Sequence, residues 1–146
     1  MGFIFTYAII VMPGLSKLSD KEFLKAFQVT DAVIQNKQPI FMLTWIGSIV
    51  SVLSLILISI TYVGLSEAWL VVLVALINLL GVQGITIFIH LPLNNQIQKL
   101  NLEKLKDENL RDERLNFENK WNFFNNIRTT IAFFVSLTLL FFLTVT

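Results

Sequence analysis

The stretch that decides the fold is residues 40–91, which read IFMLTWIGSIVSVLSLILISITYV, then GLSE, then AWLVVLVALINLLGVQGITIFIHL. Neither long run contains Asp, Glu, Lys or Arg, and the turn between them carries a single charge, Glu67. Each run has about 24 residues, or roughly 36 Å of α-helix. The hydrocarbon core of a bilayer is about 30 Å thick. The sequence therefore predicts two transmembrane helices, residues 40–63 and 68–91, joined by a tight turn.

The composition of the whole chain agrees with a membrane protein. Of 146 residues, 55% are hydrophobic and only 14% are charged, which is too apolar for a soluble domain of this length. There is no cysteine and only one histidine, so disulfides, thiolate nucleophiles and multi-histidine metal centres are excluded. A net charge of +1 gives no basic surface for nucleic acid.

Two further apolar runs complete the predicted fold. Residues 129–146 give about 27 Å of helix, and residues 2–15, which include Pro13, give only about 20 Å. The first run has no basic n-region and no small-residue cleavage site before Pro13, so we do not expect a signal peptide. We interpret it as a shortened transmembrane helix, with a half-inserted helix as the alternative. The expected fold is all-α: one domain, residues 1–146, forming a four-helix transmembrane bundle with helices at about 2–15, 40–63, 68–91 and 127–146.

The distribution of basic residues predicts the orientation. The two long polar segments, residues 16–38 and 93–126, lie on the same side of a four-helix bundle. All 11 Lys and Arg residues lie in these segments or at the start of the last helix. The positive-inside rule then places both segments in the cytoplasm and both termini outside. We expect an integral protein of a bacterial inner membrane.

The first polar segment predicts a short amphipathic helix, residues 19–35. Ser19 and Glu22 have the spacing of a capping box. Apolar and small residues follow at helical spacing: Phe23, Phe27, Thr30 and Ile34. The sequence leaves two interpretations open, a helix resting on the membrane surface or a lid over a cavity in the bundle.

The second polar segment, residues 93–126, predicts helical extensions of the third and fourth transmembrane helices. Its apolar residues fall on two different helical faces, which one straight helix cannot present to the same surface. We expect a break near residues 101–103. The charges of this segment, six basic and six acidic, are typical of a solvated face.

Polar residues inside the apolar helices are the best indicators of function, because they are costly in a membrane. The second crossing carries a stripe of small and hydroxyl residues that predicts helix packing: Thr44, Gly47, Ser48, Ser51, Ser54 and Thr61. The third carries four polar residues on one face: Gln83, Thr86, His90 and Asn94. The last helix carries a similar face: Trp121, Asn125 and Arg128. These last two faces lie at the same membrane level and predict a shared polar pocket.

Such a pocket has a limited chemistry. Arg128 is a candidate partner for a phenolate or carboxylate, and His90 is a candidate general base. Asn94 and Asn125 are candidates to orient a carbonyl or hydroxyl, and Trp121 to stack on a flat ring. The alternative is structural, because Arg and Trp also anchor helices at the membrane interface.

Four stretches, in order, resemble a family of small four-helix membrane proteins, the anthrone-oxygenase-like family. They are VMPGL at residues 11–15, FLKAFQVTDAVIQNKQPIF at 23–41, TIFIHLPLN at 86–94 and WNFFNNIRT at 121–129. The family's motif positions in this chain are His90, Pro92, Asn94, Trp121, Asn125 and Arg128. The resemblance gives these positions no individual roles.

The resemblance implies a function for only part of the family. Most members have no assigned activity, but some oxidise anthrones to anthraquinones with molecular oxygen and no recognised cofactor. This chain departs from the pattern in its shorter first helix and in Asp31, where the family often has Asn. We expect Asp31 to lie at the ligand site, pair with Arg128 and compete with an anionic ligand.

Two main hypotheses follow. The first is a cofactor-independent oxygenase acting on a flat hydrophobic phenol or ketone, with His90 and Arg128 as catalytic residues. Its substrate would contact Gln83, Thr86, Asn94, Trp121, Asn125 and Asp31. The second is a non-catalytic protein that binds a lipid or quinone, or serves as a membrane subunit. Transport is a weaker third. Expected partners are membrane lipids and a small hydrophobic aromatic ligand, with no nucleic acid, metal or cofactor, and a homo-oligomer is left open.

Overall fold

The computed structural model describes residues 2–145, all of which are placed in helices or in short turns between them. No strand occurs in that range. The predicted all-α class is therefore confirmed. The two end residues of the predicted domain, 1 and 146, lie outside the described residues.

Three continuous helical segments are long and apolar enough to cross a membrane: Pro39–Val63, Leu65–Gln98 and Asp107–Thr144. A fourth apolar helical segment, Gly2–Leu15, is shorter. The structure therefore supports a helical membrane protein with three candidate spans, and a fourth crossing stays a prediction.

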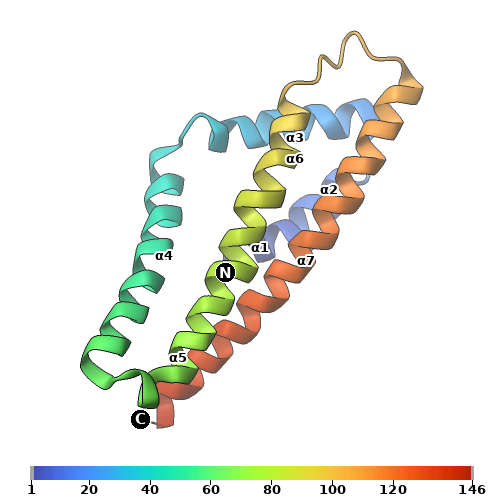
Figure 1. Ribbon diagram of the computed structural model, residues 1–146. Coiled ribbons are helices and arrows are strands. Elements are labelled where there is room, and N and C mark those ends of the chain that lie inside the picture. The colour runs from blue at the N-terminus through green and yellow to red at the C-terminus, as the bar shows by residue number, and fades with distance from the viewer. Residues whose placement is uncertain (1, 146) are drawn as a thin grey trace.

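The long helical segments stand beside one another, with a further helix crossing one of their ends (Figure 1). The third segment consists of α5 (Leu65–Asn78), the π-helical turns η3 (Leu79–Gly84) and η4 (Thr86–His90), and α6 (Leu91–Gln98). It runs beside α7 (Asp107–Val145), while α4 (Pro39–Ile58) and its π-helical end η2 (Ser59–Val63) stand further out. Helix α3 (Asp20–Gln35) lies across one end of these helices. The N-terminal segment, made of α1 (Gly2–Thr6), η1 (Tyr7–Val11) and α2 (Met12–Leu15), packs on α7.

Two of the π-helical turns end two residues before a proline. Pro13 follows η1 and Pro92 follows η4. A proline inside a helix has no N–H to donate, and its ring clashes with the carbonyl four residues earlier, which is Ile9 or Phe88 here. A wider turn relieves that clash, and such turns are frequent at functional sites. Each proline therefore resets the direction of the side chains that precede it.

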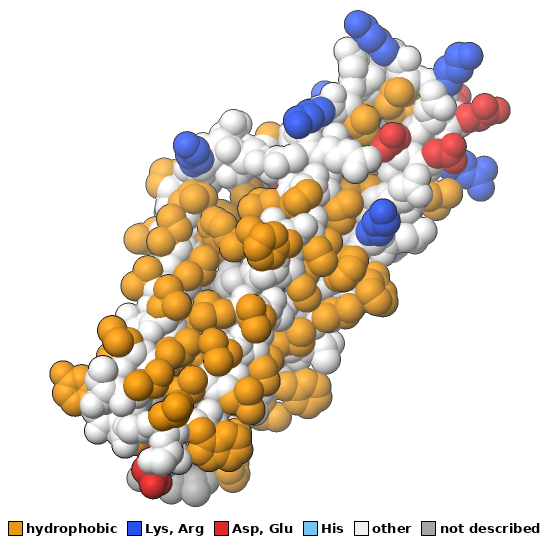
Figure 2. Space-filling model, in the orientation of Figure 1, with side chains coloured by type: hydrophobic (Ala, Val, Ile, Leu, Met, Phe, Trp, Pro, Cys, Tyr) orange, Lys and Arg blue, Asp and Glu red, His pale blue; other side chains and the backbone are white. Residues whose placement is uncertain are grey.

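The buried hydrophobic core lies at the end of the molecule where α3 crosses. Its residues come from the N-terminal segment, α3, the end of α6, the connection after it and the first half of α7: Tyr7, Met12, Phe23, Leu24, Phe27, Ile97, Leu102, Leu110, Phe117 and Trp121. Charged side chains gather around the same end, whereas apolar side chains cover the outer surface of the long helices (Figure 2). The charged end thus has a core like that of a soluble protein.

Helix α3 begins with the predicted capping box. The Ser19 backbone N–H and hydroxyl both donate to Glu22 Oε2, at 3.1 and 2.6 Å. The predicted buried face was partly wrong, because Thr30 is exposed while Leu24 and Asp31 are buried. Helix α3 contacts both α6 and α7, so its buried stripe is wider than one partner would require.

The break in the second polar segment is confirmed. Helix α6 ends at Gln98 and α7 begins at Asp107, so residues 101–103 lie in the connection. The Gln28 side chain of α3 donates to the carbonyls of Ile97 and Leu100, at 2.8 and 3.0 Å. The Ile97 carbonyl also accepts from the Leu100 N–H at 3.1 Å, so α3 adds to the hydrogen bonds that close the end of α6.

The small-residue stripe of the second crossing does not pack as expected. No residue of α4 is buried, and nothing lies within 4 Å of a Cβ placed at Gly47. The hydroxyls donate to their own helix, as Thr44 does to the Ile40 carbonyl and Ser51 to that of Gly47, and Ser48 alone of the stripe also accepts from the next span, from Gln83. The close helix approach occurs elsewhere, at Gly81, where an added Cβ would lie 2.8 Å from Ile131 of α7.

Candidate functional site

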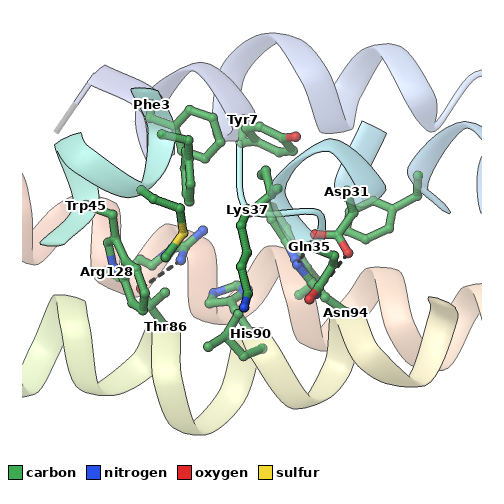
Figure 3. Close-up of a pocket in the computed structure, with 16 residues that line it drawn as sticks. Phe3, Tyr7, Asp31, Gln35, Lys37, Trp45, Thr86, His90, Asn94 and Arg128 are labelled. Carbon is green, nitrogen blue, oxygen red and sulfur yellow. Dashed lines mark hydrogen bonds between the residues drawn. The ribbon is translucent and has the colours of Figure 1, made fainter. Parts of the chain in front are cut away.

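A cavity of about 250 Å³ lies beneath α3, between the N-terminal segment, α4, η4–α6 and α7. Figure 3 shows side chains from all of these elements facing it. Its apolar wall includes Phe3, Phe27, Ile34, Phe41, Met42, Trp45 and Leu91. Its polar wall consists of Tyr7, Asp31, Gln35, Lys37, Thr86, His90, Asn94, Trp121 and Arg128. Helix α3 therefore closes one side of a cavity, as the lid interpretation requires.

Arg128 projects from α7 into this space and is 5% exposed. Its Nε donates to Asn125 Oδ1 at 2.9 Å, and Nη1 donates to Thr86 Oγ1 at 3.0 Å. The guanidinium also lies over the Trp121 ring, 5.6 Å from its centroid. No carboxylate within residues 2–145 pairs with it. A buried guanidinium held only by neutral groups is suited to receive an anionic oxygen.

His90 lies on the same wall and is 2% exposed. Its ring meets Trp121 edge to face, with centroids 4.9 Å apart. By hydrogen-bond distance and angle, neither ring nitrogen is paired with a described residue, although the Phe124 backbone lies near the ring. Buried polar atoms are rarely left unpaired in proteins. An imidazole left unpaired beside a cavity is therefore available to a bound molecule.

The expected pairing of Asp31 with Arg128 is wrong. Asp31 is 2% exposed and its carboxylate accepts from three amides: Asn94 at 2.7 Å, Gln98 at 3.0 Å and Gln35 at 3.2 Å. The amides take up both carboxylate oxygens, because α3 places Asp31 above α6 rather than above α7. Asp31 thus joins α3 to the cavity wall without neutralising Arg128.

Asn94 and Trp121 extend this network across the cavity wall. The Asn94 amide nitrogen donates to Asp31, and its carbonyl oxygen accepts from Trp121 Nε1 at 3.1 Å. Trp121 is thereby fixed between His90 and Arg128, with a face toward the guanidinium. A fixed indole at this position offers a flat surface for an aromatic ligand.

The other two predicted residues lie outside this cavity. Gln83 lines an adjoining cavity of about 310 Å³, which shares Thr86 and Arg128 with the first. There it accepts from Trp45 Nε1 at 2.9 Å and donates to Ser48 Oγ at 3.2 Å. Asn125 is fully buried behind Arg128 and also donates to the Ile4 carbonyl at 3.3 Å. Asn125 therefore positions Arg128 and does not line the cavity.

A comparison of the sequence with protein-family models finds a match that includes most residues of this wall. The family model described as anthrone oxygenase matches residues 37–138, more than half of the chain. The chain belongs to the anthrone oxygenase family. The match contains the last two of the four stretches quoted above, and therefore contains His90, Asn94, Trp121 and Arg128. No curated protein and no solved structure matches the chain.

Several wall residues of this anthrone oxygenase family member were not predicted. Tyr7 lies close enough to Asp31 and Arg128 to interact electrostatically with both. Lys37 enters from the connection between α3 and α4, and Trp45 from α4. A tyrosine in an otherwise apolar run was a usable signal for Tyr7. No feature of the neighbouring sequence identified Lys37 as a wall residue, because its position depends on how α3 crosses the bundle.

Among residues 2–145, no three His, Asp or Glu side chains gather in a way that could hold a metal ion. The functional groups that the described residues bring to the cavity include an imidazole, a guanidinium, a phenol and an indole.

Proposed function

We propose that this anthrone oxygenase family member is a membrane enzyme that oxidises a flat hydrophobic phenol or ketone with molecular oxygen and without a cofactor. One observation carries the proposal: an unpaired imidazole and a guanidinium without a carboxylate partner face one cavity, on either side of a fixed indole. A base, an oxyanion partner and an aromatic surface are what such a reaction needs from a protein.

The reaction starts with a proton transfer. A hydroxyanthrone has a methylene between two aromatic rings, conjugated with a carbonyl. His90 takes one methylene proton, and the electron pair moves into the ring system to form an enolate. The guanidinium of Arg128 receives the enolate oxygen and stabilises its charge as it develops. Trp121 holds the ring plane between the two groups.

Oxygen then reacts with the electron-rich enolate. One electron passes to O2, the two radicals combine to form a C–O bond, and the imidazolium returns its proton to give a hydroperoxide. Loss of the second methylene proton with cleavage of the O–O bond gives the ketone and water. Overall, a CH2 group and O2 become C=O and H2O, so oxygen itself is the oxidant.

The setting of the cavity suits this substrate class. Three candidate spans surround it with apolar surface, and a flat aromatic molecule partitions into a bilayer with membrane lipids. We place the charged end, with residues 16–38 and 93–126, in the cytoplasm of a bacterium, on the basis of the positive-inside rule. In this proposal the N-terminal segment is the fourth helix of the transmembrane bundle. The proposal does not specify whether the protein forms a homo-oligomer.

Oxygen uptake by the detergent-purified protein, supplied with a hydroxyanthrone, tests the proposal. Because anthrones autoxidise, the rate is measured against a blank without protein. The variants are His90→Gln, which keeps a polar side chain but removes the base, and Arg128→Lys, which keeps the charge but removes the planar fork. We expect each to lower the rate above the blank by at least about 100-fold.

The matched control is Arg111→Lys, on an exposed face of the same helix, which should keep the full rate. Wild-type uptake no faster than the blank would remove this activity and favour a protein that binds a lipid or quinone. Uptake that persists in His90→Gln would remove His90 as the base.

A further inference from the structure

Lys37 occupies a backbone position that is unfavourable for lysine. It is the one residue other than glycine in the range 2–145 with a positive φ, which is 60°. It follows α3 as the left-handed residue of a helix-ending motif, in which Lys37 N–H donates to the Ile34 carbonyl and Gln38 N–H to that of Val33. Glycine is the usual residue at this position, because any Cβ is strained there. The stability of the helix end would therefore be greater with glycine.

The Lys37 side chain lines the cavity from the opposite side to Arg128. In Figure 3 it runs from the α3–α4 connection into the space between Asp31 and Arg128. Its ammonium makes no ion pair in the described part of the chain. The nearest acidic wall residue, Asp31, already receives three amide donors.

The charges of the cavity are therefore out of balance. Two cations line it, Lys37 as an exposed residue and Arg128 as a buried one, and neither is paired with a carboxylate. The one carboxylate in the wall is occupied by amides. Two unpaired cations on opposite sides of one apolar cavity favour a ligand that carries negative charge at its edge.

We propose that Lys37 is a specificity-determining residue that, with Arg128, selects flat aromatic ligands bearing an anionic oxygen group, a carboxylate or a phenolate. The inference rests on the proposed function for its ligand class but concerns binding alone. Lysine at this strained position costs stability and supplies the charge that glycine lacks.

Binding of two matched probes tests the inference. Anthraquinone-2-carboxylate and the neutral anthraquinone-2-carboxamide are titrated into the detergent-solubilised protein, and quenching of tryptophan fluorescence gives each Kd. We expect the wild type to bind the carboxylate about tenfold more tightly than the carboxamide. Lys37→Asn, which tolerates the same backbone conformation, should remove most of that preference while leaving the Kd of the carboxamide unchanged.

Two further variants complete the test. Lys25→Asn removes an exposed lysine of α3 that does not line this cavity, and should keep the preference. Lys37→Gly should lose the preference and raise the midpoint of thermal unfolding, which shows that the loss is not caused by misfolding.

Equal affinity of the wild type for both probes, no binding of either, or a preference that survives in Lys37→Asn would each overturn the inference. The binding readout is independent of turnover. A preference for the carboxylate without oxygen uptake would reject the proposed oxygenase activity and support the role of Lys37 in ligand selection. Oxygen uptake without the preference would support the oxygenase activity and reject the role of Lys37.

Discussion

The two ends of the molecule are stabilised in different ways. The charged end lies where α3 crosses, and the rest of the long helices, including α4, Gly81 and the second half of α7, forms what we call the apolar limb. At the charged end, α3 crosses α6 and α7 and buries Phe23, Leu24 and Phe27 almost completely. In the apolar limb, α4 has no buried residue, and Leu43 is 76% exposed. Exposure of this kind is unfavourable in water but neutral in lipid.

The difference shows which solvent each region requires. The charged end gains its stability from removing apolar surface from water, as a soluble domain does. The limb leaves its apolar surface to lipid, so its helices need close contact only where backbones approach, as at Gly81. The cavity lies where these two regions meet, and its lining combines buried charge with apolar side chains.

The largest expected effect comes from truncating the core of the charged end. Phe117 lies 4.5 Å from Phe27 and 6.4 Å from Phe23, measured between ring centroids. Phe117→Ala should lower the free energy of unfolding by about 3–5 kcal/mol. Phe141→Ala, on the same helix but 64% exposed, should change it by less than about 0.5 kcal/mol. Unfolding in detergent, followed by circular dichroism, measures both, and equal losses would contradict the division into two regions.

An intermediate effect is expected at the close approach within the limb. Gly81→Val places new methyl groups against Ile131, whose Cδ1 lies 2.8 Å from the position of the added Cβ. Overpacking there should cost about 1–3 kcal/mol. Gly47→Val, with open space around it, is the matched control and should cost less.

The same unfolding measurement serves for these two variants. Adding Ile131→Ala should recover part of the loss in Gly81→Val and none in Gly47→Val. Failure of this rescue would show that the helices do not approach at Gly81.

A smaller effect, dependent on pH, is expected at the start of α3. Hydrogen bonds from Ser19 hold the pKa of Glu22 below its usual value of 4.5. A depressed pKa in the folded state contributes stability above the unfolded pKa, and this stability is lost as the pH falls through the folded pKa. Ser19→Ala should therefore lower the stability of the folded protein at pH 7.

Thermal unfolding of wild type and Ser19→Ala at pH 7, 5 and 3 measures this effect. The difference in unfolding midpoint between the two proteins should be largest at pH 7 and smaller at pH 3. Ser66→Ala, at the exposed start of α5, controls for general effects of acid and should show no such trend. A difference that stays constant with pH would exclude the carboxylate of Glu22 from the cap.

The sequence predicted those features that depend on local chemistry. Uncharged runs identified the long helices, and the spacing of Ser19 and Glu22 identified the start of α3. Helical spacing also placed Thr86, His90 and Asn94 on one wall. Each of these rests on residues within a few turns of one another, where helix geometry alone fixes the arrangement.

Features that depend on the crossing of helices were not predictable. The predicted partner of Asp31 was wrong because α3 lies above α6, where Gln28 bonds to the end of α6, and residue spacing within α3 does not determine that placement. Lys37 was missed for the same reason, and Asn125 was predicted to face the ligand when it supports Arg128. The packing predicted for the α4 stripe failed because hydroxyls can bond to their own helix.

Pro92 should make the helix backbone just before it easier to open. Where a proline interrupts the bonding ladder of a span, the backbone opens locally at a lower free energy than in the regular turns around it. The segment in question, Thr86–His90, forms the cavity wall that carries the imidazole. Its amide hydrogens should exchange with deuterium faster than those of Leu65–Asn78 in the same span. A flat molecule dissolved in lipid would then enter as one wall bends, without separation of the long helices.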